Sequence, residues 1–130
     1  MSDKVLIAVV DDSASLREAT KSLLKALGFT AETFSSAEEF LNSDRVRVTA
    51  CLIADVQMPG MSGVDLHRQL VRSGNHIPTI LITAYPDERV RLRALQDGVA
   101  CYLAKPVKED DLLDCIRSGL GNPGANAKGP

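Results

Sequence analysis

No apolar run in this chain of 130 residues is long enough to cross a membrane, and neither sign of charge dominates. The first apolar segment, residues 5–10, is too short for a membrane-spanning helix or for the apolar region of a signal peptide. Lys and Arg number 15 against 17 Asp and Glu, so the chain lacks the basic character that favours non-specific binding to nucleic acid. We therefore expect a cytoplasmic domain with no membrane segment and no direct contact with nucleic acid.

Cysteine and histidine are scarce. The three cysteines, Cys51, Cys101 and Cys115, are odd in number and widely spaced, so we expect small reduced core residues and no disulfide or metal knuckle. The two histidines, His67 and His76, have no metal-ligating partner at a useful spacing, and we expect both at the surface.

Short apolar segments alternate with amphipathic helical segments along the chain. The apolar segments predict strands at residues 5–10, 30–34, 51–54, 77–82 and 100–104. Helices are predicted at about residues 15–27, 62–72, 86–97 and 109–118, and the capping box at residues 36–39 opens a further short helix. Five such βα units predict a flavodoxin-like α/β sandwich of three layers, with a parallel five-stranded sheet in the order 2-1-3-4-5.

The chain length is that of a single domain. Residues 1–120 contain every predicted element, and we expect them to form that domain. Residues 121–130 are rich in Gly, Pro, Asn and Ala, with almost nothing to bury. We expect this segment to be a flexible tail or the start of a linker.

Polar residues follow four of the predicted strands at the point where each apolar run stops. Asp11 and Asp12 follow the first strand, Asp55 the third, Thr83 the fourth and Lys105 the fifth. The carboxyl ends of parallel strands lie along one edge of the sheet, and ligands bind there. The strand order therefore predicts that these side chains converge, with both of the paired acids beside Asp55.

Three carboxylates in one crevice require a cation or a raised pKa. Two carboxylates about 4 Å apart repel by roughly 4 kcal/mol at an effective dielectric constant near 20. Oxygen ligands with an open face suit Mg²⁺. With the charge neutralised, Asp55 could attack a phosphoryl group to form an acyl phosphate, while Lys105 and Thr83 stabilise its oxygens. The site lacks a strong general base, so the donor must already be activated, as in a phosphohistidine or a small acyl phosphate.

The motifs that carry these residues resemble those of the receiver domain of two-component response regulators. They are Val9-Val10-Asp11-Asp12, the loop at residues 55–63, Thr83-Ala84 and Lys105-Pro106, and the resemblance covers about residues 4–118. The segment at residues 34–41 is also similar to the FixJ-type branch, whose members often carry a helix-turn-helix output domain.

The resemblance implies a role for each residue around Asp55. Asp55 would accept the phosphoryl group from a sensor histidine kinase or a histidine phosphotransfer protein. Asp12, Asp55 and the backbone carbonyl of Gln57 would bind Mg²⁺, with Asp11 acting mostly through water. Lys105 would pair with the phosphoryl group. On this reading the domain is a signalling switch and not an enzyme, because it catalyses only its own phosphorylation and dephosphorylation.

The resemblance also implies a switch. Thr83 would move toward the phosphoryl group and the ring of Tyr102 would turn inward behind it. The surface of the fourth helix, fifth strand and fifth helix would then change and control a downstream protein or a fused output domain. A homodimer through the fourth helix is common in the family. The bond before Pro106 is expected to be cis. The small side chain of Ala84 leaves the site accessible, and the bulky side chain of Tyr85 would hinder a water that attacks the phosphoryl group.

Two other functions compete with this interpretation. A metal-dependent aspartyl phosphohydrolase would need a second acid two residues after the nucleophile, where this chain has Gln57. A flavin-binding protein would need a Ser/Thr/Gly-rich loop after the first strand, where this chain has Asp11 and Asp12. A separate choice concerns Arg89, Arg91 and Arg93 on the fourth predicted helix, which form either a solvated face or a docking surface.

Overall fold

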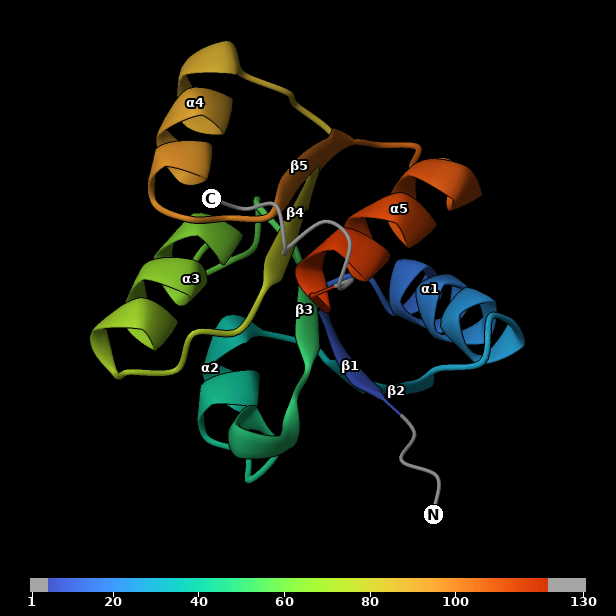
Figure 1. Cartoon of the computed structure of the whole chain (residues 1–130). Coiled ribbons are helices and arrows are strands. Elements are labelled where there is room, and N and C mark those ends of the chain that lie inside the picture. The colour runs from blue at the N-terminus through green and yellow to red at the C-terminus, as the bar shows by residue number, and fades with distance from the viewer. Residues whose placement is uncertain (1–4, 122–130) are drawn as a thin grey trace.

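Five parallel strands form the middle layer of the computed structural model, which describes residues 5–121 (Figure 1). The sheet has the order β2-β1-β3-β4-β5, so the predicted flavodoxin-like topology is confirmed. The strands are β1 (Leu6–Val10), β2 (Thr30–Phe34), β3 (Cys51–Asp55), β4 (Thr79–Thr83) and β5 (Cys101–Ala104). The expected flexible segment from residue 121 onward lies, apart from residue 121 itself, outside the described residues.

Helices cover both faces of the sheet. In Figure 1, α1 (Ala14–Ala26) and α5 (Glu109–Gly119) lie on one side, and α2 (Ala37–Leu41), α3 (Gly63–Arg72) and α4 (Glu88–Gln96) lie on the other. A short 3₁₀ helix, Val46–Val48, precedes β3 and was not predicted. The fourth helix starts later than expected, because the side chain of Asp87 caps it and Pro86 lies before the cap.

The apolar residues of each strand divide between two cores. On β1, Ile7 and Val9 belong to the core beneath α1 and α5, whereas Ala8 and Val10 belong to the core beneath α2, α3 and α4. A central parallel strand is buried on both faces, which explains why its sequence is a continuous apolar run instead of an alternating one. Each large apolar side chain buried in this way contributes roughly 1.5–3 kcal/mol to folding.

The prediction for the cysteines is wrong at two positions. Cys101 on β5 and Cys115 on α5 form a disulfide, with their Cα atoms 6.1 Å apart. The pair is 14 residues apart in the chain, but α5 packs back onto the sheet so that both residues enter the same apolar core. Cys51 remains a free thiol, and burial raises its pKa to about 12.

The prediction of a surface position is also wrong for His67, whose residue is only 5% exposed. His67 lies on α3 directly after the buried Leu66, and it is itself one of the buried residues of that helix. Burial lowers the pKa of the imidazole, although the nearby Asp97 carboxylate opposes that effect. His76 is exposed, as predicted.

None of the helices within residues 5–121 combines the length and the hydropathy that a membrane span requires.

Candidate functional site

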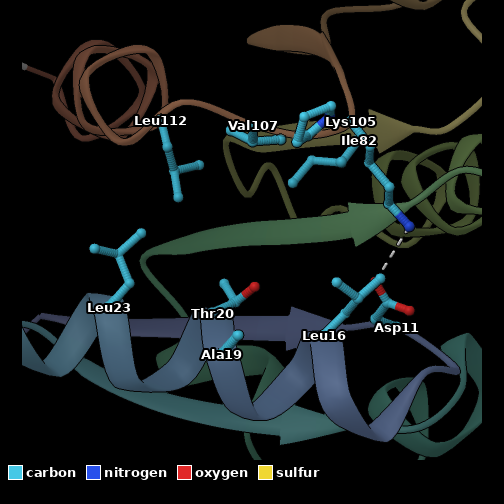
Figure 2. A pocket seen from close by; sticks show the side chains of 10 residues that line it. Asp11, Leu16, Ala19, Thr20, Leu23, Ile82, Lys105, Val107 and Leu112 are labelled. Carbon is cyan, nitrogen blue, oxygen red and sulfur yellow. Dashed lines mark ion pairs between the residues drawn. The ribbon is translucent and has the colours of Figure 1, made fainter.

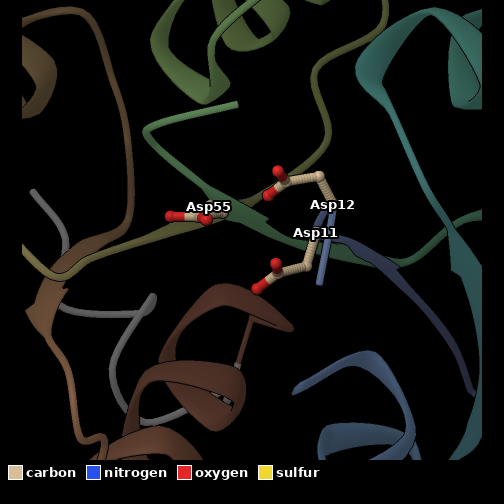
Figure 3. A group of neighbouring side chains, drawn as sticks. All are labelled: Asp11, Asp12 and Asp55. Carbon is tan, nitrogen blue, oxygen red and sulfur yellow. The ribbon is translucent and has the colours of Figure 1, made fainter. Parts of the chain in front are cut away.

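The five expected site residues converge at the carboxyl edge of the sheet, as the strand order predicts. Asp55 and Thr83 are the last residues of β3 and β4, Asp11 and Asp12 directly follow β1, and Lys105 directly follows β5. Figure 3 shows the three carboxylates turned toward a common space from β1 and β3.

The three acids are close enough to share one cation. One carboxylate oxygen from each of Asp11, Asp12 and Asp55 lies within 4.8 Å of the other two. Asp12 is exposed, whereas the side chains of Asp11 and Asp55 retain only 13% and 7% exposure. The cluster therefore has one open side and two largely buried members.

The start of α1 orients Asp11. Its carboxylate accepts a hydrogen bond from the backbone N–H of Ser13 at 2.9 Å, and Ser13 in turn caps the helix. The guanidinium of Arg17 donates to the backbone carbonyl of Asp11 at 2.8 Å. These contacts hold the strand end against the first turn of α1, so that the carboxylate of Asp11 points along the edge toward Asp55.

The two oxygens of Asp55 have different surroundings. The Lys105 ammonium donates to Oδ2 at 3.3 Å and lies 3.7 Å from a carboxylate oxygen of Asp11. The other oxygen, Oδ1, is buried and has no hydrogen-bond partner among the described residues. Burial, followed by the charge of Asp11, raises the pKa of Asp55, and Lys105 acts against both.

A buried oxygen without a partner loses about 1–3 kcal/mol of solvation. A cation ligated by Oδ1 of Asp55 would restore that loss and would also relieve the repulsion among the three carboxylates. The donor set consists of oxygens on one open-sided cluster, which is the chemistry that Mg²⁺ prefers. The residues therefore fit the expected magnesium ion.

The loop after β3 depends on two glycines, Gly60 and Gly63. A Cβ atom on Gly63 would lie 2.5 Å from the backbone oxygen of Asp55, so α3 can begin this close to the strand only with glycine there. Gly60 has a φ of +78°, and the neighbouring N–H of Met61 donates to the carboxylate of Glu38 at 3.1 Å. The loop is thereby attached to α2, a contact that no local motif in the sequence reveals.

Only one of the two hydrogen bonds expected in the capping box at residues 36–39 is present. Ser36 accepts from the N–H of Glu39 at 3.0 Å, but the carboxylate of Glu39 binds the backbone N–H of Ser35 and not that of Ser36. Glu38, beside it, is the residue that reaches the loop after β3.

The hydroxyl of Thr83 is completely buried and already engaged. It donates to the side-chain oxygen of Gln57 at 2.7 Å and accepts from the backbone N–H of Tyr85 at 2.9 Å. Tyr85 itself is 73% exposed, and Ala84 is exposed beside it.

The ring of Tyr102 is half-buried, and its hydroxyl accepts from the N–H of Asp87 at 3.2 Å, at the start of α4. The sequence identified Thr83 and Tyr102 as candidates but gave no indication of the hydrogen bond between Gln57 and Thr83.

A groove of about 530 Å³ runs between α1 and α5 and ends at the site. Figure 2 shows Leu23 of α1 facing Leu112 of α5 across it, and Leu16 of α1 at the other end beside Asp11, toward which the Lys105 ammonium is directed. The peptide bond that joins Lys105 to Pro106 is cis, in agreement with the resemblance.

A family model of the response regulator receiver domain matches residues 7–117, which include all of these site residues. The chain belongs to the receiver domain family of response regulators. Receiver domains are phosphorylation-activated signalling domains, and the alternative of a phosphohydrolase gains no support from the similarities.

Individual relatives agree with this assignment. The receiver domain is 40% identical to response regulator protein TodT of Pseudomonas putida over 121 residues, which make up 92% of this chain and 53% of TodT. It is 31% identical to transcriptional regulatory protein FixJ of Azorhizobium caulinodans over 93% of this chain and 57% of FixJ. The predicted likeness to the FixJ-type branch is thus confirmed.

The solved structure of the response regulator StyR matches the receiver domain with a TM-score of 0.85 and 39% identity, over 98% of this chain and 64% of that one. The chain spans about half the length of the curated relatives described above.

Proposed function

We propose that this receiver domain accepts a phosphoryl group on Asp55 from a phosphohistidine of a sensor histidine kinase or of a histidine phosphotransfer protein. The observation that carries the proposal is the asymmetry of the Asp55 carboxylate. One of its oxygens lies 3.3 Å from the Lys105 ammonium, and the other is buried without a partner beside two further acids.

We further propose that Asp11, Asp12, Asp55 and the backbone carbonyl of Gln57 hold Mg²⁺, with Asp11 acting mostly through water. When bound, Mg²⁺ would neutralise the acidic cluster and the incoming phosphoryl oxygens. The open face over the exposed Asp12 leaves access for a phosphoryl group. The buried, unpartnered oxygen of Asp55 supports this arrangement.

The transfer requires little from the side chains beyond position and charge. A carboxylate oxygen of Asp55 forms a bond to phosphorus while the bond from phosphorus to the imidazole nitrogen of the donor breaks. Lys105, which pairs with Asp55 before transfer, then pairs with the phosphoryl oxygens. The donor imidazole leaves with the bonding electron pair, so no general base from this chain is required.

The groove between α1 and α5 supports a protein as the donor. It is lined mainly by apolar side chains, and Leu16 at its edge is 41% exposed. A partner that packs on this surface would bring its phosphohistidine to the end of the groove, where Asp11 and Lys105 lie.

The output surface proposed here consists of α4, β5 and α5, with Thr83 and Tyr102 as the switch. Tyr102 is in contact with the start of α4 through its hydroxyl, so a movement of its ring would alter that helix end. The target would be a downstream protein or an output domain outside this chain, and the α4 face is also available for a homodimer. A cytoplasmic location is part of the proposal, because sensor kinases and phosphotransfer proteins would act on the domain there.

Arg89 and Arg93 line a shallow groove between α3 and α4, whereas Arg91 is paired with Glu88 at 2.6 Å on the same helix. We assign Arg89 and Arg93 to the docking surface and Arg91 to a solvated helix face.

The test is phosphorylation with acetyl phosphate and Mg²⁺, followed by mass spectrometry of the intact protein and of its peptides. We expect one acid-stable, base-labile phosphoryl group on the peptide that contains Asp55, and none in the Asp55→Asn variant or after chelation of the metal. An unmodified wild-type protein, or equal modification of Asp55→Asn at that peptide, would overturn the proposal.

A further inference from the structure

The hydroxyl of Thr83 has a single proton, and that proton already takes part in a hydrogen bond. It is donated to the side-chain oxygen of Gln57 at 2.7 Å, while the lone pairs accept the N–H of Tyr85 at 2.9 Å. A hydroxyl can donate only one hydrogen bond at a time. Any new acceptor for Thr83 must therefore displace Gln57.

The phosphoryl group on Asp55 would be that new acceptor, a step that rests on the function proposed above. Thr83 would exchange a neutral amide oxygen for an anionic phosphoryl oxygen. Hydrogen bonds to a charged acceptor are about twice as strong as neutral ones, so phosphorylation favours the exchange. The gain is nevertheless reduced by the strength of the bond to Gln57 that must first break.

The position of Gln57 allows it to bind Thr83 and then to release it. It is exposed and lies two residues after Asp55, on the loop that is attached to α2 through Glu38 and packed closely against Gly63. Thr83, in contrast, is buried at the end of β4. A fixed loop therefore presents a solvent-accessible side chain to a buried hydroxyl, and the side chain can be released into water without disturbing the core.

We infer that the side chain of Gln57 is a latch that holds Thr83 in its unphosphorylated position and thereby sets how readily the domain switches. Gln57 is a positioning residue in this role, since it acts through Thr83. The role is separate from that of its backbone carbonyl, which is proposed above as a metal ligand and remains present in every variant of Gln57.

The test compares Gln57→Met with the wild type. Methionine is similar in length but offers no amide oxygen to Thr83. The probe is beryllofluoride with Mg²⁺, which stands for the phosphoryl group on Asp55, and binding is followed by NMR at the amide of Tyr85. We expect Gln57→Met to bind the probe about fivefold more tightly, the change that corresponds to one net hydrogen bond. The same substitution at Gln69 of α3 is the matched control and should leave the affinity unchanged.

A double-mutant comparison separates the latch from a general structural effect. In a Thr83→Ala background the hydroxyl is absent, so Gln57→Met should no longer change the affinity for the probe. Equal binding by wild type and Gln57→Met, or an equal gain with and without the hydroxyl, would overturn the latch. A wild-type protein that binds no beryllofluoride would instead overturn the proposed function.

Discussion

The ammonium of Lys105 lies 3.3 Å from Oδ2 of Asp55, a residue fifty positions earlier in the chain. The pair joins the loop after β5 to the end of β3, although β4 lies between these two strands in the sheet. It brings a positive charge to a carboxylate whose pKa is raised by burial and by Asp11. The ion pair keeps Asp55 more acidic than its surroundings alone would allow.

The Lys105→Met variant removes this charge and keeps most of the side-chain volume. We expect phosphorylation by acetyl phosphate to slow by about 10- to 100-fold, because a hydrogen bond to a charged group contributes about 1.5–3 kcal/mol. The pKa of Asp55 should also rise further, so that activity shifts toward higher pH. The rate is measured by intact-protein mass spectrometry over time. Lys108→Met, at an exposed lysine nearby, is the control, and an equal loss there would refute the specific role of Lys105.

Gly63→Ala tests the close approach of α3 to Asp55. The added methyl group would meet the backbone oxygen of Asp55 at 2.5 Å, so the strand end and the helix must separate. We expect a loss of about 1–3 kcal/mol in the free energy of unfolding and, in the folded protein, slower phosphorylation of Asp55.

Gly74→Ala serves as the comparison for that variant. Gly74 has a φ of +83° but no atoms within 4 Å of the position of a Cβ, and it lies at the end of α3 away from the site. This variant should lose about 1 kcal/mol of stability from backbone strain and keep the wild-type rate of phosphorylation. If both variants phosphorylate normally, the close approach at Gly63 has no bearing on the site.

The buried His67 should make the free energy of unfolding depend on pH. Burial lowers the pKa of His67 in the folded protein below the value of about 6.5 in the unfolded chain. Below that value the unfolded chain binds more protons than the folded protein, so stability falls as the pH falls. The stabilisation is fully present above the unfolded pKa and declines as the pH drops toward the folded one. Urea unfolding between about pH 7.5 and pH 5.5 should reveal this decline.

In the His67→Gln variant the decline should become smaller, since glutamine does not titrate in this range. The exposed His76 offers the control, and in His76→Gln the unfolding free energy should change with pH as steeply as in the wild type. A slope that is identical in all three proteins would show that His67 does not contribute.

The disulfide between Cys101 and Cys115 can be tested by counting free thiols. A thiol titration of the denatured, unreduced protein should find the single thiol of Cys51, and reduction should raise the number to all three cysteines of the chain. In the chain-entropy account, a disulfide that closes a loop of this size contributes about 3 kcal/mol. A reductant should therefore lower the unfolding free energy of the wild type by a similar amount, and leave the Cys101→Ser, Cys115→Ser double variant unaffected. Three reactive thiols before reduction would contradict the pairing.

Much of this protein follows from sequence pattern alone. The apolar runs, their spacing and the glycine at the end of α1 (Gly28) define alternating strands and helices, because these features depend on local periodicity and backbone conformation. Five βα units favour the flavodoxin-like strand order, and that order places the acids after β1 beside Asp55 without any knowledge of side-chain positions. Residue type supplies the remaining inference, since carboxylates beside a lysine favour a cation and an anionic group as ligands.

Other features depend on pairs of atoms that only the packed chain brings together. The sequence places His67 on α3 but does not show that its side chain is buried. The spacing of Cys101 and Cys115 says nothing of how α5 returns to β5, and the need for glycine at position 63 arises only from a backbone oxygen eight residues earlier. The hydrogen bond between Gln57 and Thr83 also depends on how two separate elements pack. Periodicity indicates which residues of one element share a face. The distance between two side chains depends instead on how whole elements pack, and that packing determines which hydroxyl, oxygen or ammonium is free to react.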